Sequence, residues 1–495
     1  MKNIYTLLTG LLLTQLAIGQ CNYDNSYWET KAAPTSIGDS IVTYLYGGEF
    51  TTVTGMQAGN VYQISTCGDG AFDSQLTVYE SGGTFLEAYN DDYSVCAPQS
   101  RIYFSPFTSD NYDILVDEYD CASNSIPITV TIKLFDIPKP IITIPTVVHV
   151  IHNNSTENIS NAQIQSQIDV LNEDFSRLNS DVFSAPSRFR GFSKDIRVEF
   201  CLAERDPNGN STDGITRTAT TFGPFGSLSN GGNNEMKYTS MGGNDAWNRD
   251  DYLNIWVVDL SGTTLGYAQF PGAAAATDGV VIDYEYFGTT GTATAPFDLG
   301  RTTTHEVGHW LDLYHIWGDD GTACTGTDNI NDTPNQGGYS SGCPSAPNSC
   351  SNGGYGGDMY VNYMDYSDDD CLNMFTYWQY RRMDATLYNS RNSLISSNGC
   401  SSPLGIAENK IFSDISIYPN PNTGVFNIEF YTLNSTMVNY RIIDMIGQEV
   451  FNERSTEKIQ GAVKKKIRVG DIPKGVYTLQ ISSDNEKINR KIIIH

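Results

Sequence analysis

Three of the six histidines lie close together, and their spacing constrains the fold more than any other feature of the chain. His305 and His309 are four residues apart, so a helix presents both imidazoles on one face. Glu306 lies beside the first of them, and His315 must turn back to reach the same point. Three imidazoles with an open fourth position are typical of a catalytic zinc site. The alternative, a helix with core histidines, is disfavoured by a third histidine at this distance.

Residues 303–315 resemble the long zinc motif of the metzincin metallopeptidases, H-E-x-x-H-x-x-G-x-x-H. The chain departs from the motif at Asp312, where the family usually has glycine. That glycine ends the helix in a left-handed conformation, which Asp tolerates better than most residues do. The resemblance implies an α/β metzincin catalytic domain in which the three histidines bind Zn²⁺. It also implies that Glu306 is the general base that takes a proton from zinc-bound water.

A second segment, residues 362–376, resembles the Met-turn of the pappalysin family, and this resemblance extends over residues 137–400. It implies that Met364 forms the apolar floor beneath the metal and that Tyr366 helps to stabilise the oxyanion. The alternative for Met364 is ordinary core packing. It differs little, because the Met-turn role is itself a packing role.

Asp369 follows Met364 by five residues. In pappalysins that cleave before basic residues, an Asp at this spacing lies at the base of the pocket for the side chain after the scissile bond. The resemblance therefore implies cleavage on the N-terminal side of Arg and Lys, since a buried carboxylate needs a cationic partner. The alternative is that Asp369 belongs to a solvated run, residues 368–370, and that the endopeptidase has a broader specificity.

Residues 324–334 resemble the calcium loop of the pappalysins. Oxygen ligands suit Ca²⁺, and the resemblance implies that these come from Asp328, Asp332, Thr333 and the carbonyl of Ile330. The alternative is an Asx-rich turn without an ion.

The chain has ten cysteines, an even number that an oxidising compartment would pair. The pappalysin resemblance implies crossed disulfides, Cys324–Cys350 and Cys343–Cys371, which leaves Cys201 and Cys400 as a plausible last pair of that region. Four cysteines precede it and allow three connectivities: Cys21, Cys67, Cys96 and Cys121.

Residues 1–20 carry Lys2 followed by an apolar run, as a secretory signal peptide does. Cys21 raises the alternative of a lipoprotein anchor, which Gln20 disfavours because such processing sites usually have a small residue there. No later stretch is apolar for long enough to span a bilayer.

Residues 21–136 favour β-structure, because runs such as 60–65, 75–79 and 128–132 are rich in β-branched and aromatic residues. They predict an N-terminal β-sandwich that serves as an accessory domain. Within residues 137–400, strands are expected at 144–151, 255–258 and 279–282, with helices at 161–178 and 300–312. The segment 265–271 resembles the edge strand that pairs with substrate in this family, which implicates Tyr267 and Ala268 in substrate binding.

A linker at residues 401–411 precedes a C-terminal segment, residues 412–495, that reads as a small β-sandwich. The segments 417–421, 475–477 and 491–494 resemble the C-terminal sorting domain of type IX secretion. The resemblance implies that the secretion machinery is a partner and that the protein reaches the cell surface or the medium.

The net charge of −27 argues against nucleic acid as a partner and is compatible with bound calcium. Together these features predict a secreted zinc endopeptidase that acts on proteins or peptides. One alternative is an inactive, binding-only relative of the peptidases, which the presence of Glu306 disfavours. A second alternative is an adhesin that binds glycans.

Overall fold

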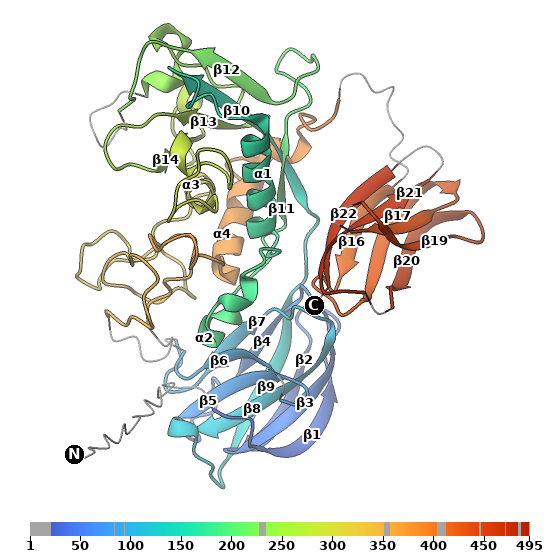
Figure 1. The fold of residues 1–495 in the computed structure, drawn as a ribbon. Coiled ribbons are helices and arrows are strands. Elements are labelled where there is room, and N and C mark those ends of the chain that lie inside the picture. Colours follow the sequence, from blue (N-terminus) through green and yellow to red (C-terminus); the bar gives the residue numbers. More distant parts are fainter. Residues whose placement is uncertain are drawn as a thin grey trace, which may run out of the picture.

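The computed structural model describes residues 21–494 except for 84, 94, 227–233, 351–356, 403–411, 445–446, 471 and 484–486. The expected signal peptide and most of the expected linker lie outside the described residues. The chain forms three parts: an N-terminal β-sandwich, a central α/β part, and a C-terminal β-sandwich (Figure 1).

The N-terminal sandwich packs a five-stranded sheet, in the order β1-β3-β8-β5-β6, against a four-stranded sheet, β2-β9-β4-β7. Its strands are β1 (Ser26–Ala32), β2 (Ser40–Tyr46), β3 (Glu49–Met56), β4 (Val61–Ser65), β5 (Ser74–Glu80), β6 (Leu86–Asn90), β7 (Arg101–Phe104), β8 (Asp110–Glu118) and β9 (Pro127–Asp136). Alternating apolar side chains from both sheets fill the space between them. Of the three possible connectivities the structure has Cys21–Cys121 and Cys67–Cys96, so Cys21 is a disulfide partner.

The central part is built on a mostly parallel sheet in the order β11-β10-β13-β15-β14, with β12 also paired to β10. Its strands are β10 (Ile142–His152), β11 (Val198–Leu202), β12 (Ile215–Ala219), β13 (Leu253–Val258), β14 (Gly266–Ala268) and β15 (Val280–Asp283). As expected, β14 is a short edge strand, and it runs antiparallel to β15. A disulfide between Cys201 on β11 and Cys400 ties the C-terminal end of this part to its sheet.

The helices of the central part are α1 (Asn161–Phe175), α2 (Ser187–Arg190), α3 (Arg301–Trp310) and α4 (Tyr377–Tyr388). Helix α1 begins where the side chain of Ser160 accepts a hydrogen bond from the Gln163 amide. It ends at Phe175, three residues before the expected end, because Arg177 adopts a left-handed φ of 54°. The apolar face of α1 lies in the same core as α3 and α4.

The N-terminal sandwich has its own core, and a few of its residues also pack into the core of the central part. Val61, Tyr93 and Tyr103 of the sandwich belong to the same hydrophobic cluster as the α4 residue Tyr377. The rings of Tyr103 and Tyr377 are stacked with centroids 5.9 Å apart. Buried Lys194 also donates from Nζ to the Gly59 carbonyl of the sandwich at 2.5 Å. The sandwich is therefore packed onto the central part as part of one folded unit.

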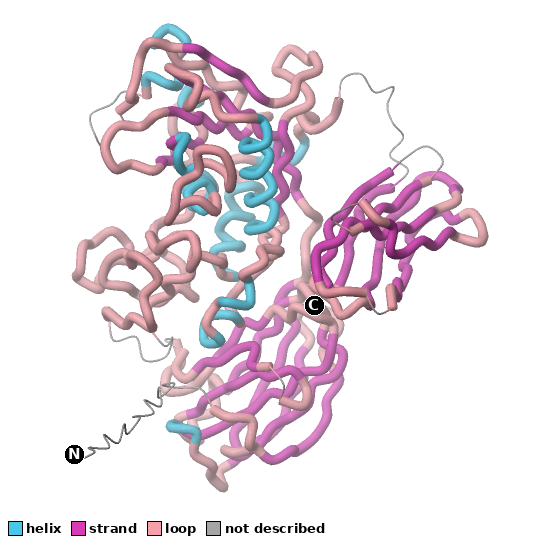
Figure 2. The backbone as a smooth tube through the Cα atoms, in the orientation of Figure 1, coloured by secondary structure: helices cyan, strands magenta, loops and turns pink. Residues whose placement is uncertain are grey.

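The C-terminal part has its own core between two sheets, β16-β17-β20 and β19-β18-β21-β22. Its strands are β16 (Phe412–Tyr418), β17 (Val425–Thr436), β18 (Asn439–Ile443), β19 (Glu449–Arg454), β20 (Ile459–Arg468), β21 (Gly475–Ser482) and β22 (Lys487–Ile494). Figure 2 shows this part as strands and loops. An ion pair between Lys491 and Glu173 of α1 links it to the central part. Among the described residues, none of the helices has the length and apolar character that a membrane span requires.

Candidate metal centre and active site

The site is built on helix α3, every residue of which is buried. Gly300 precedes the helix with a φ of 76°, and Thr304 donates to Asp174 of α1 at 2.6 Å. The helix ends at Trp310, and Asp312 then adopts the left-handed φ of 77° that the sequence predicts for this position. Arg382 of α4 holds the Asp312 carboxylate at 3.0 Å. The left-handed turn at Asp312 therefore lets the chain that follows α3 fold back, so that His315 reaches the histidines of the helix.

The three predicted histidines converge on one point. Nε2 of His309 lies 3.0 Å from Nε2 of His305 and 3.0 Å from Nε2 of His315. Each Nδ1 atom lies at hydrogen-bond distance from an oxygen. His305 Nδ1 is 2.7 Å from the Tyr363 carbonyl oxygen, and His309 Nδ1 is 2.7 Å from the Leu313 carbonyl oxygen. His315 Nδ1 is 2.8 Å from Asp319 Oδ1. Because each Nδ1–H donates to its oxygen, each Nε2 carries the free lone pair.

A divalent cation fits this arrangement. The lone pair of His309 faces those of His305 and His315 at 3.0 Å, and such lone pairs repel unless a positive charge lies between them. Burial first, and then the neighbouring imidazoles, lower the pKa of His305, and burial lowers the pKa of His309 to about 3. Both rings are thus neutral, as metal ligands must be. Among the described residues these histidines form the single group of three or more ligating side chains.

Glu306, the residue after His305 on α3, lies beside the edge strand β14. It is 7% exposed, and burial raises the pKa of its carboxyl to about 8. A Cβ on Gly266 of β14 would come within 3.2 Å of the Glu306 side chain. Strand β14 therefore passes directly beside Glu306. Phe270, just beyond the strand, lies with its ring 5.2 Å from that of His309.

Strand β14 also carries the two expected substrate-binding residues. The hydroxyl of Tyr267 donates to Asn234 Oδ1 at 2.8 Å, so its side chain is engaged within the protein. Ala268 packs against the main core. Only their backbone groups at the sheet edge are suited to pair with another chain.

The Met-turn residues lie beneath and beside the histidines. Met364 is fully buried, and a Cβ on Gly308 would meet its sulfur at 2.5 Å, so glycine is needed for this close approach. Tyr366 is 46% exposed, with its ring 5.4 Å from that of His305 and 5.0 Å from that of His315. The Tyr366 ring thus lies at the edge of the metal site.

Asp369 is buried at the start of α3. It is 1% exposed, and its Oδ2 accepts hydrogen bonds from the amides of Leu299 at 2.8 Å and Arg301 at 3.3 Å. Burial raises the pKa of this carboxyl to about 6. Asp369 therefore does not belong to a solvated run, although Asp370 beside it is exposed. The sequence did not predict that Asp369 also caps a helix.

The expected calcium ligands lie together in a loop against α4. Asp328 accepts hydrogen bonds from the Ile330 amide at 3.0 Å and the Thr333 hydroxyl at 2.7 Å. Asp332 accepts from the Thr376 hydroxyl at 2.7 Å and the Trp378 amide at 3.0 Å, so it also caps α4. Burial raises the pKa of both carboxyls to about 7. A cation would favour their charged forms.

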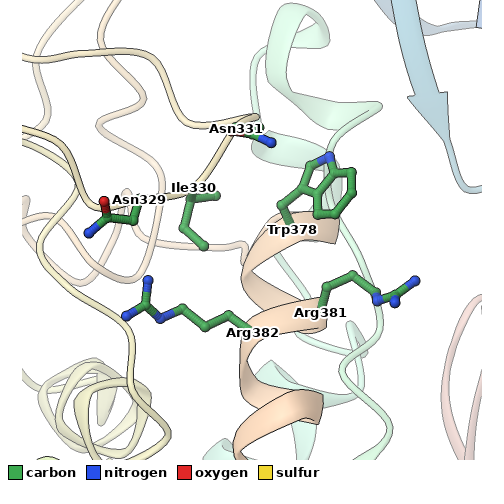
Figure 3. Close-up of a pocket in the computed structure, with 6 residues that line it drawn as sticks. All are labelled: Asn329, Ile330, Asn331, Trp378, Arg381 and Arg382. Atoms are coloured by element: carbon green, nitrogen blue, oxygen red, sulfur yellow. The ribbon is translucent and has the colours of Figure 1, made fainter.

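A cavity of about 310 Å³ opens beside this loop. Figure 3 shows Arg381 and Arg382 of α4 on one side and the loop residues on the other. Cys324 pairs with Cys350 and Cys343 with Cys371, as the pappalysin resemblance implies, and these disulfides tie the loops between α3 and the Met-turn together.

Two residues at the site were missed by the sequence analysis. Asp319 orients His315, and its position four residues after that histidine was the available signal. Trp317 stacks on the His315 ring at 4.2 Å with an interplanar angle of 10°. No spacing rule marks an aromatic residue of this kind in a loop.

Comparison with known proteins places this site in a family. Residues 237–388 match the family model described as pregnancy-associated plasma protein-A, and residues 416–495 match that of the secretion system C-terminal sorting domain. An extracellular metalloprotease of Arthroderma benhamiae is 32% identical over 246 residues, which is 49% of this chain and 76% of the relative. Extracellular metalloprotease 1 of Coccidioides posadasii is 35% identical over 261 residues, 50% of this chain and 78% of the relative.

Solved structures agree with these relatives. A structure of mature mirolysin from Tannerella forsythia, in complex with a cleaved peptide, is 53% identical to this chain. It superposes with a TM-score of 0.50 and covers 52% of this chain and 97% of the mirolysin chain. The predicted family, fold class and enzyme class are thereby confirmed. This chain belongs to the pappalysin family of metzincin metalloproteases, and it is a secreted metalloendopeptidase with a type IX secretion sorting domain.

Proposed function

We propose that the enzyme hydrolyses peptide bonds with a zinc ion held by His305, His309 and His315. The observation that carries this proposal is the meeting of three Nε2 atoms, each on a ring whose Nδ1 is tied to an oxygen. Zinc in such a ligand set supplies Lewis acidity.

Glu306 is proposed as the general base. Its burial favours the protonated form, so the carboxylate readily takes a proton from the attacking water and then gives it to the leaving nitrogen. Tyr366, whose partly exposed ring lies beside two of the histidines, is proposed to donate a hydrogen bond from its hydroxyl to the developing oxyanion. The free edge of β14 is proposed to hold the substrate as an added strand.

The test is Glu306→Ala, with Glu306→Gln as the isosteric partner. Both variants should bind zinc as the wild type does and lose peptide cleavage by about 10²-fold or more. Zinc content by metal analysis and hydrolysis of a quenched peptide are measured on the same samples. Near-wild-type turnover in either variant would remove Glu306 from this role. Loss of zinc together with activity would instead assign it a structural one.

We further propose that cleavage occurs on the N-terminal side of Arg and Lys, with Asp369 as the carboxylate that recognises the basic side chain. Support comes from its burial, since a desolvated carboxylate gains most from a cationic partner. Arg can engage it bidentately, while Lys offers a point charge.

Asp369 also caps α3, so the test has to separate charge from capping. Asp369→Asn keeps an acceptor oxygen for the two amides but removes the charge. It should lower kcat/KM for basic over neutral peptides more than roughly tenfold, an ion-pair loss above about 1.4 kcal/mol. The matched control is Asp370→Asn at the exposed neighbour, which should keep the preference. If the control variant loses it instead, Asp370 is the recognition residue. A wild-type library profile dominated by apolar residues would leave an endopeptidase of broader specificity.

The three parts of the chain are proposed as an accessory sandwich at residues 21–136, a peptidase domain at 137–400 and a sorting domain at 412–495, joined by the linker at 401–411. Separate cores in the two sandwiches support this division.

We also propose a bound Ca²⁺ at Asp328, Asp332, Thr333 and the Ile330 carbonyl. The burial of the two carboxyls supports it, because burial disfavours their charged forms and a bound cation would offset that cost.

A further inference from the structure

We propose that the active site carries a second specificity element, an aromatic wall made of Trp317, Tyr339 and Tyr366. The wall would bind an aromatic side chain of the peptide substrate at one position of the segment that lies along the histidines. This inference rests on the peptidase site proposed above and adds a substrate preference to it.

The wall is continuous with the metal site. Trp317 lies parallel to the His315 ring at 4.2 Å, and Tyr366 meets Trp317 edge-on at 4.8 Å. Tyr339 extends the surface outward, with its ring 5.5 Å from that of Tyr366 and 5.9 Å from that of Trp317. These separations are those at which aromatic rings attract one another. A substrate side chain that passes the proposed oxyanion donor Tyr366 therefore reaches Tyr339 next.

Exposure rises along the wall from the inside outward. Trp317 is 6% exposed and belongs to the main core, Tyr366 is 46% exposed, and Tyr339 is 62% exposed. Two large rings thus face solvent at the rim of a peptidase site while the third anchors them. Covering such rings with an apolar side chain releases water and gains ring–ring attraction, which makes an aromatic residue the best-matched occupant.

The turn that carries the outer ring, Tyr339, is held in place by Asp365, the residue before Tyr366. The buried Asp365 carboxylate accepts from Gln336 Nε2 at 2.8 Å and from the Ser340 amide at 2.8 Å. It also accepts from the Tyr366 amide at 2.8 Å. One carboxylate thus fixes the two ends of the turn that carries Tyr339 to the Met-turn. A ring that is already positioned loses little entropy when substrate binds, so its contacts add to specificity.

The test compares paired peptides that differ only by Phe or Ala at each position around one cleavage site. The wild type should prefer Phe at one position. Tyr339→Ala should lower that Phe-to-Ala ratio of kcat/KM by about fivefold, the value of one ring–ring contact of about 1 kcal/mol. Tyr339→Phe should keep the ratio, because the ring is retained. The matched control is Tyr44→Ala, since Tyr44 is also 62% exposed but lies on β2 of the N-terminal sandwich.

Three results would overturn the inference. The first is an unchanged Phe-to-Ala ratio in Tyr339→Ala with zinc content intact. The second is an equal loss on all peptides, which would make Tyr339 a support for Tyr366. The third is a loss confined to basic side chains, which would place the ring in the pocket of Asp369. Failure of the wild type to cleave any peptide would instead refute the proposed function itself.

Discussion

His315 differs from the two helical histidines in what holds its imidazole. His305 and His309 sit on a buried helix and donate to backbone carbonyls, which side-chain substitution cannot remove. His315 lies in a loop and relies on the side chain of Asp319, which is itself exposed. His315, the proposed third ligand, is therefore the one whose orientation can be loosened by a single substitution at a neighbouring residue.

Replacing Asp319 by Ala should accordingly weaken zinc binding by roughly 10–100-fold, and His315→Ala should weaken it further. Competition with a chromogenic chelator measures both affinities. His152→Ala is the control, because His152 ends β10 outside the cluster and should not affect zinc. Full zinc affinity in His315→Ala would mean that the third ligand is a different side chain.

The sequence predicts these residues well because their chemistry is local. The spacing of His305 and His309 requires only a helix, and the left-handed turn at Asp312 follows from the motif that surrounds it. Trp317 and Tyr339 could not be predicted in the same way. They meet through loops whose paths are set by disulfides and by the long-range contacts of Asp365.

At the scale of elements, the loop at residues 328–333 and helix α4 stabilise each other. Asp332 of the loop accepts hydrogen bonds from the Thr376 hydroxyl and the Trp378 amide at the start of α4, and Arg382 of α4 donates to the Asp328 carbonyl at 3.3 Å. The contact of Asp332 could not be predicted from the sequence, because Asp332 and Thr376 lie 44 residues apart and no local rule pairs them.

Chelation of calcium by EGTA, at a concentration that leaves zinc bound, should lower the melting temperature. A site filled at about 100 times its Kd contributes about 2.7 kcal/mol, which such treatment would remove. Asp328→Asn should reproduce the loss and be insensitive to EGTA. Asp328 is the better choice, because Asp332 also caps α4. An unchanged melting temperature in EGTA, with zinc retained, would refute the calcium site.

At the scale of the whole molecule, the contact between the N-terminal sandwich and the central part buries charge. Glu87 of β6 is 2% exposed, and burial raises the pKa of its carboxyl to about 7 against the opposing effect of Arg177 and Arg190. The pKa of Glu87 is higher in the folded protein than in the unfolded one. The stability that this group contributes is therefore fully present below about pH 4.5 and is lost as the pH rises through about 7.

Thermal unfolding should therefore shift to lower temperature between pH 6 and pH 8, and Glu87→Gln should reduce that shift. The part removed should be about 1.4 kcal/mol, the value of one pKa unit. The exposed Glu457→Gln is the control and should leave the shift unchanged. The same pH dependence in all three proteins would exclude Glu87 as its source.

The C-terminal sandwich has its own core, so its removal should spare the peptidase. Deletion of residues 412–495 should leave a folded, active enzyme in the periplasm, because the proposed outer-membrane address is gone. Fractionation with an activity assay measures this. Wild-type levels of the truncated protein in the medium would contradict the proposed role of residues 412–495 as a secretion signal. The strand pattern of this segment predicts only a small β-domain. Its role as a secretion signal is indicated by the family motifs in the sequence.

The disulfide between Cys201 and Cys400 has a consequence for how the enzyme responds to a cut in its backbone. It encloses every histidine of the metal site within one covalent ring of backbone. A single cut in any loop of that ring opens it without releasing a fragment. Nicked enzyme should therefore run as one full-length band on a non-reducing gel and separate into two pieces only after reduction. A backbone cut that would separate an enzyme without this disulfide into two fragments leaves this enzyme as one covalently linked molecule.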